Sequence, residues 1–140
     1  MSFNKILDIA ATGMSAQRLR VQLISANVAN SETTRTPAGG PFVKKDAVFQ
    51  VMPMGETVDG MPLFGVNYPQ IHDSHDPFIY KYEPGHPDAN EDGIVVYPNV
   101  NPIEEVVNLT EAARSFDANV NVVRAVRQMG QAALDILRTS

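Results

Sequence analysis

The segment Ala10–Asn30, AATGMSAQRLRVQLISANVAN, carries the pattern that decides the fold. From Phe3 onward, eight residues follow one another at alternating spacings of 3 and 4, and seven of them are apolar: Phe3, Leu7, Ala10, Met14, Gln17, Val21, Ile24 and Val28. Residues at this spacing share one face of an α-helix. A helix from Ser2 to Asn30 would be roughly 43 Å long, and an isolated amphipathic helix is marginal in water. The predicted helix therefore needs a partner.

The C-terminal segment supplies that partner. It begins with NPIEE, in which Asn101 can cap a helix, Pro102 fits the first helical position and Glu104 can close a capping box. The same 3-4 spacing then runs through ten residues, eight of them apolar: Val106, Leu109, Ala113, Phe116, Val120, Val123, Arg127, Gly130, Leu134 and Leu137. The sequence therefore predicts two terminal helices that pair as in a coiled coil.

The second helix carries more apolar surface than one partner helix would cover. Its stripe is widened on one side by Val122, Val126, Met129, Ala133 and Ile136. A plain helical hairpin is the simpler alternative, but the surplus favours contacts with other subunits. The predicted subunit-interface residues are Phe3, Leu7, Met14, Val21, Ile24, Asn27, Val28, Leu109, Phe116, Asn119, Val120, Val123, Val126, Met129, Leu134 and Leu137.

The middle of the chain differs from both flanks. All 10 prolines lie between Pro37 and Pro102. Short β-like runs at 42–52, 66–71, 77–82 and 93–98 alternate with turn signals such as Asp59-Gly60 and Asp92-Gly93. Prolines inside the runs favour edge strands and irregular pairing. The predicted fold class is α+β, with a discontinuous helical domain at 1–36 and 103–140 and a small irregular antiparallel β region, with a connecting arm, at 37–102.

Composition excludes several function classes. The net charge is -5 and the 11 basic residues form no basic run, so nucleic acid is not an expected partner. No stretch approaches the ~20 apolar residues of a membrane-spanning helix, so direct membrane insertion is not expected. The N-terminus lacks the charged-then-apolar order of a Sec signal. With no cysteine, disulfides, thiolate nucleophiles and sulfur-ligated zinc are also excluded.

The one cluster of metal-competent residues is HDSHDP at 72–77, with His86 nearby. Its spacing matches no ligand signature, and a solvated loop is the better interpretation, although a small metal-dependent enzyme stays an alternative. A hydrolytic set of Ser74, His86 and Asp92 lacks any supporting motif such as a G-x-S-x-G elbow. We predict no enzymatic activity, no catalytic or metal site and no cofactor.

Three motifs resemble bacterial flagellar basal-body rod proteins of the rod and hook axial family. They are SANVANSETT at 25–34, PGHPDANEDGIVVYPNVN at 84–101 and EAARSFDANVNVVRAVRQM at 111–129, and in family order they span nearly the whole chain. The first is shared widely among axial proteins, and the second is more specific to the proximal rod. A helical component of another type III secretion-like assembly is the alternative, but such a protein should lack the second motif.

The resemblance implies a structural subunit of the proximal rod, located in the periplasm-spanning basal body. Such proteins pair their terminal helices into an axial domain, assemble helically with other rod proteins and copies of themselves, transmit torque and surround the export channel. The resemblance also implies passage through the flagellar type III export apparatus, without cleavage of a signal peptide.

Asparagines mark the end of the first helix and recur in the second. Asn30 is the predicted C-terminal cap, in a left-handed conformation. Asn27 and Asn119 each lie in an ANV triplet beside the apolar stripe. A semi-buried asparagine penalises wrong register or wrong partners. We therefore expect both side chains to form hydrogen bonds within or between subunits, and a double substitution by Leu to spare the fold while degrading assembly.

Overall fold

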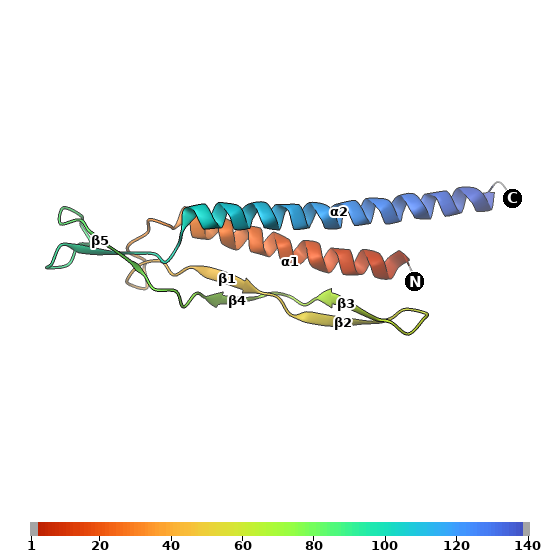
Figure 1. Cartoon of the computed structure of the whole chain (residues 1–140), viewed down its shortest axis with the longest axis horizontal. Helices are drawn as coiled ribbons and strands as arrows, with labels where there is room; N and C mark the ends of the chain where they lie inside the picture. The colour runs from red at the N-terminus through yellow and green to blue at the C-terminus, as the bar shows by residue number, and fades with distance from the viewer. Residues whose placement is uncertain (1–2, 139–140) are drawn as a thin grey trace. The chain divides into compact units, whose positions relative to one another are not determined.

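Two long helices flank six short strands along the chain in the computed structural model, which describes residues 3–138 (Figure 1). The predicted α+β class with terminal helices is confirmed. In chain order the elements are α1 (Phe3–Ala29), β1 (Lys45–Val48), β2 (Val51–Glu56), β3 (Pro62–Val66), β4 (Gln70–Asp73), β5 (Ile79–Tyr82), β6 (Ile94–Tyr97) and α2 (Pro102–Arg138).

The strands form three separate two-stranded sheets, β1–β4, β2–β3 and β5–β6. The β2–β3 and β5–β6 pairs are antiparallel. The β-like run predicted at 42–52 contains β1 and the start of β2, separated by Phe49 and Gln50. The chain changes partner at this break, from β4 to β3. The predicted run 66–71 spans the matching break between β3 and β4.

The described residues group into two compact units, and each unit takes part of both helices. Unit 1 holds residues 3–19, 48–70 and 111–138, and unit 2 holds residues 20–47 and 71–110. The grouping follows contacts within the folded chain. The division into a helical domain and a separate β region stays a prediction.

Unit 1 packs the β2–β3 hairpin against the first part of α1 (Figure 1). The hydroxyl of Thr12 accepts a hydrogen bond from the backbone N–H of Val66 at 3.1 Å. It donates to the carbonyl of Ile9 at 2.7 Å, so one side chain joins helix to strand. Such close approach needs a small residue, because a Cβ at Gly65 would lie 3.0 Å from the hydroxyl oxygen of Thr12 and would also collide with the sulfur of Met54. The buried apolar side chains of the unit are Ala10, Ala16, Leu63, Ala112 and Val126.

The β2–β3 hairpin has the irregular pairing that the sequence predicted. Its register shifts between Pro53 and Glu56, where Gly55 adopts a φ of 98°. Asp59-Gly60 forms the predicted turn, with Gly60 at a φ of 77°. Only glycine adopts such angles without steric strain, which places the bulge and the turn at these positions.

In unit 2, polar side chains cap the last turn of α1 and the first turn of α2. The amide of Asn30 donates to the carbonyl of Ala26 at 2.9 Å and so satisfies the last turn of α1. The left-handed conformation predicted for Asn30 is wrong, because every positive φ within residues 3–138 belongs to a glycine. At α2 the prediction is confirmed: Asn101 accepts the N–H of Ile103 at 3.1 Å, and Pro102 is the first helical residue.

Candidate functional site

A buried polar cluster joins three segments of unit 2. Glu105, in the first turn of α2, is only 1% exposed. One of its carboxylate oxygens lies 3.2 Å from the ammonium nitrogen of Lys44, just before β1. The other accepts a hydrogen bond from Nδ2 of Asn27, near the end of α1, at 3.0 Å. We call Asn27, Lys44, Asn99 and Glu105 the polar joint, because together they link the two helices to β1.

The side chain of Asn27 forms two hydrogen bonds to the backbone of Lys45, as the backbone of a neighbouring strand would. Its Nδ2 donates to the carbonyl of Lys45 at 2.9 Å, and its Oδ1 accepts the N–H of Lys45 at 3.0 Å. The side chain is 1% exposed. Replacing Asn27 by Leu would leave these backbone groups and Glu105 short of a partner, which costs stability. The expectation that the fold tolerates this substitution is therefore revised for Asn27.

Asn99 holds Lys44, the residue that precedes β1. Its Oδ1 accepts the N–H of Lys44 at 2.8 Å, and its Nδ2 donates to the carbonyl of Asp76 at 3.0 Å. Asn99 is 8% exposed. Two motif asparagines thus hold consecutive residues of one segment, which fixes where α2 starts relative to β1.

The charges of the joint stabilise one another. Burial alone would lower the pKa of Lys44, but the carboxylate of Asp46 and the hydrogen bond and charge of Glu105 raise it above its usual value. Asp46 lies 3.8 Å from the Lys44 ammonium and is half exposed. Since a buried charge without a partner is costly, Lys44 and Glu105 depend on each other.

The predicted interface residues fall into three classes of exposure within one chain. In unit 2 the buried ones are Ile24 and Asn27, and the half-buried ones are Val21, Val28 and Leu109. In unit 1 Val126 is buried, and the half-buried ones are Leu7, Met14, Phe116, Asn119, Val120 and Val123. The exposed ones are Phe3, Met129, Leu134 and Leu137. Their contact with other subunits stays a prediction.

In unit 1 the helices meet where Gly13 faces Asn119. A Cβ at Gly13 would lie 2.9 Å from Nδ2 of Asn119, whose side chain instead donates to the carbonyl of Ser115 at 3.1 Å. The start of α1 and the end of α2 lie at the same end of unit 1, so the helices are antiparallel (Figure 1). Because antiparallel helices run in opposite directions from Gly13 and Asn119, Phe3, ten residues before Gly13, lies level with Met129, ten residues after Asn119. The last turns of α2 therefore extend past the described part of α1.

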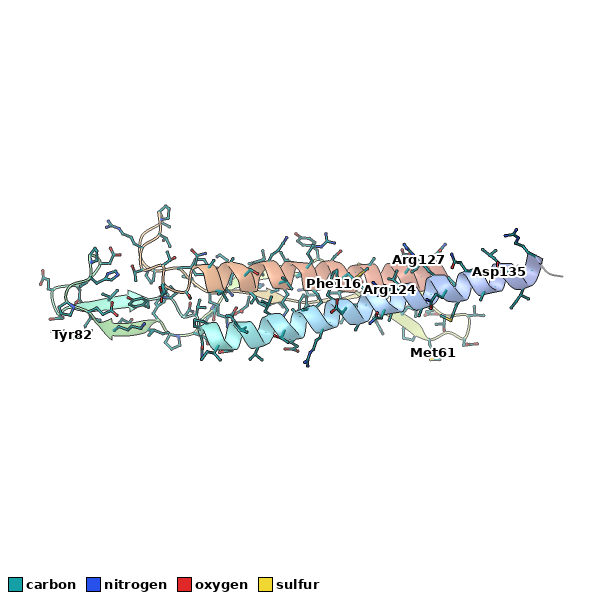
Figure 2. The ribbon with its side chains drawn as sticks, turned by 90° about the horizontal axis from the view of Figure 1, so that it is seen from above. Met61, Tyr82, Phe116, Arg124, Arg127 and Asp135 are labelled. Carbon is teal, nitrogen blue, oxygen red and sulfur yellow. The ribbon has the colours of Figure 1, made fainter. Side chains whose placement is uncertain are left out.

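Figure 2 shows these last turns with side chains projecting from α2. Met129, Leu134 and Leu137 are 52%, 61% and 74% exposed. Leu137, eleven residues after Val126, continues the face that is buried there, and Leu134, seven residues after Arg127, lies beside it. The apolar stripe is thus at least half-buried at Phe116, Val120, Val123 and Val126, and exposed beyond them at Leu134 and Leu137.

The structure gives no support to the alternative enzymatic sites. Within residues 3–138, no group of three or more His, Cys, Asp or Glu side chains could hold a metal ion. In the HDSHDP run, Ser74 donates to Asp76 at 2.7 Å and Nδ1 of His75 lies 3.1 Å from the carbonyl of Asp73. Such contacts two residues apart are typical of turns.

Sequence reasoning found Asn27 but missed Lys44, Asn99 and Glu105. The only local signal was position: Asn99 lies in PNVN, residues 98–101 at the end of the second motif, and Glu105 follows shortly after it. Glu104 was favoured over Glu105 for a role at the helix start, yet Glu104 is exposed and Glu105 is buried. The pairing of Glu105 with a lysine 61 residues away leaves no periodic pattern.

Neither described helix combines the length and the hydropathy that crossing a bilayer requires. Comparison with known families gives two matches. Residues 7–35 match the family described as flagella basal body rod protein. Residues 91–136 match the C-terminal family of the flagellar basal body rod FlgEFG proteins. The second match contains Asn99 and Glu105 of the polar joint.

Individual relatives cover almost the whole chain. The flagellar basal-body rod protein FlgC of Borreliella burgdorferi is 36% identical over 94% of this chain and 95% of its own length. FlgC of Salmonella typhimurium is 36% identical over 92% of this chain and 93% of its own. FlgC of Agrobacterium fabrum is 33% identical over 94% and 93%. With this identity over nearly the full length of both chains, the protein belongs to the FlgC family of flagellar basal-body rod proteins.

Proposed function

We propose that this protein is a structural subunit of the bacterial flagellar basal-body rod, where it assembles with other basal-body components and catalyses no reaction. Its membership in the FlgC family supports the location and the class of partner. The observation that carries the assembly role is the uncovered apolar end of α2. Met129 and Leu137 are both more than half exposed on the isolated chain, which is costly unless neighbouring molecules cover them.

The mechanism is mechanical. Helices that bury apolar faces against neighbours resist sliding, because each displacement exposes apolar surface or breaks close packing. Many modest contacts acting in parallel carry a load that no single contact would. Helical assembly with other rod proteins and with copies of this chain would transmit torque along the rod and leave a channel at its centre. The other predicted interface residues belong to this proposal.

The route to the rod is also part of the proposal. Relatives of this type are expected to pass through the flagellar type III export apparatus without signal cleavage. The chain lacks cysteine, so it would fold after export without forming disulfides. A helical component of a different type III secretion-like assembly is the weaker candidate, because the relatives that match nearly the full chain are named as flagellar rod proteins.

The test compares Leu137→Asp with Gln128→Asp in cells whose own copy of the protein is deleted. Gln128 is exposed on the opposite face of α2. Leu137→Asp should spare the fold, since the side chain is 74% exposed, but should abolish swimming and rod formation. Gln128→Asp should leave both intact. Normal rods in electron micrographs of the Leu137→Asp strain would refute the assembly role of this face.

A photocrosslinking residue at Met129 gives a second measurement. It should trap other rod proteins or further copies of this chain, identified by mass spectrometry of purified basal bodies. The same residue at Gln128 is the matched control. Trapping only proteins from outside the flagellum would point to a different assembly.

A further inference from the structure

The last third of α2 carries an arginine stripe. Five exposed residues follow one another at spacings of 3, 4, 3 and 4: Arg124, Arg127, Gln131, Leu134 and Arg138. This spacing places them along one face of the helix, over about 21 Å from first to last. Arg124 and Arg127 are labelled on α2 in Figure 2. No ion pair within residues 3–138 joins the three arginines to an acidic side chain.

The charges of the chain are divided unequally between its units. Unit 1 has 6 basic and 6 acidic residues and is neutral, whereas unit 2 has 5 basic and 10 acidic residues and carries the whole net charge of -5. Three of the six basic residues of unit 1 lie in the arginine stripe. A basic surface and an acidic unit therefore occur on the same chain.

The acidic unit offers one surface that fits arginine. Within the β5–β6 loop, Glu83 accepts the hydroxyl of Tyr97 at 2.8 Å, and Asp88 accepts the hydroxyl of Thr34 at 2.7 Å. Glu91 and Asp92 are exposed, and within the described residues their carboxylates form no hydrogen bond or ion pair. The carboxylates of Glu83 and Asp88, by contrast, each accept a hydrogen bond.

Two exposed tyrosines lie on β5, the strand that leads into this loop. Tyr80 and Tyr82 alternate along β5 and so lie on one side of the hairpin, 66% and 74% exposed. Tyr82 pairs with Ile94, and a Cβ at Gly93, the residue after Asp92, would lie 2.9 Å from the Tyr82 ring. We call Tyr80, Tyr82, Glu91 and Asp92 the acidic tip. Carboxylates beside aromatic faces suit arginine, which pairs with both.

We propose that the arginine stripe of one copy binds the acidic tip of a second copy. The proposal rests on the assembly role proposed above and names the partner surface for part of it. Stripe and tip are different surfaces, so the contact is heterologous: each copy offers one surface to one neighbour and the other surface to the next. Contacts of this kind build open helical arrays rather than closed pairs.

Charge favours a second copy as the occupant. Two acidic units repel one another, so copies with a net charge of -5 approach best where the stripe meets the tip. Leu134 lies within the stripe and adds apolar contact with a tyrosine ring. Because all participants are exposed, salt should weaken the contact.

The absence of cysteine makes a direct test possible. Full-length chains with Gln131→Cys are mixed with chains carrying Glu91→Cys, and the disulfide-linked heterodimer is measured under mild oxidation. Chains with Ala125→Cys, an exposed residue on the far side of α2 from Arg127 and Gln131, replace the Gln131→Cys chains as the control. We expect about tenfold more heterodimer than in the control at low salt, from several exposed ion pairs acting together, and little difference at high salt.

A charge swap distinguishes a specific contact from nonspecific association. Arg127→Glu in the Gln131→Cys chain should reduce the heterodimer to the control level. Asp92→Arg in the Glu91→Cys chain should restore it. Heterodimer equal to the control in the unmodified pair, or no restoration by the swap, would overturn the proposal.

The same cysteine pair in basal bodies distinguishes this contact from the rod role itself. If the chain is recovered in basal bodies but residues 131 and 91 of separate copies do not crosslink, the proposed contact is wrong and the rod role stands. If the cysteine at 131 traps a different protein instead, the occupant is that partner and the proposal is again wrong. If the chain is absent from basal bodies, the rod role fails, and the measurement in solution decides the contact.

Discussion

Glu105→Gln is the sharpest test of the polar joint. The substitution keeps the size of the side chain and an oxygen that can accept from Asn27, so only the negative charge is lost. Removing one partner of a buried ion pair costs roughly 3–5 kcal/mol. Lys44 keeps some compensation, because its side chain is 11% exposed and Asp46 lies 3.8 Å away. We therefore expect a loss of about 3 kcal/mol in the free energy of unfolding, at the lower end of that range.

The assay is urea unfolding of the purified chain followed by circular dichroism of the helices. Glu104→Gln is the matched control, since Glu104 lies in the same helical turn but is exposed. It should change the free energy of unfolding by less than about 0.5 kcal/mol. A double variant, Lys44→Met with Glu105→Gln, removes both charges. It should be more stable than Glu105→Gln alone, because no unpaired charge stays buried.

Two results would refute this reasoning. The first is a Glu105→Gln variant that unfolds at the same urea concentration as the Glu104→Gln control. The second is a double variant whose loss of stability equals the sum of the two single losses, since additive losses mean that the two side chains do not interact.

Two further predictions concern alkaline pH and helix packing. The pKa of Lys44 is raised in the folded chain, so its contribution to stability is complete below about pH 10.5 and is lost as pH rises through the higher folded value. Tyr97, whose pKa is raised by its hydrogen bond to Glu83, shifts stability in the same direction. The urea midpoint should fall above that pH, and less steeply in Lys44→Met; equal slopes would contradict the role of Lys44. Gly13→Ala should stabilise an Asn119→Ala background by about 0.5–1 kcal/mol through helix propensity. In the native background the Cβ meets Asn119 at 2.9 Å, so thermal unfolding should show a smaller gain or a loss, and equal gains would refute the contact.

The helices and their ends could be predicted from the sequence because the responsible interactions are local. Stacking at spacings of 3 and 4 depends on neighbouring turns alone, and the cap at Asn101 acts on Ile103, two residues away. The turn at Asp59-Gly60 follows from the freedom of glycine at positive φ. The family could be recognised for the same reason, since its motifs are contiguous runs of sequence.

Tertiary structure alone decided which polar residues are buried. Glu104 and Glu105 are adjacent and chemically alike, and only the arrival of Lys44 and Asn27 from distant segments makes Glu105 the buried one. Likewise, the strand breaks after Val48 and Val66 occur where the chain changes its pairing partner. Burying a charge is favourable only when its partner is brought to it in space, and the spacing of residues along a chain does not encode which distant residue that partner will be.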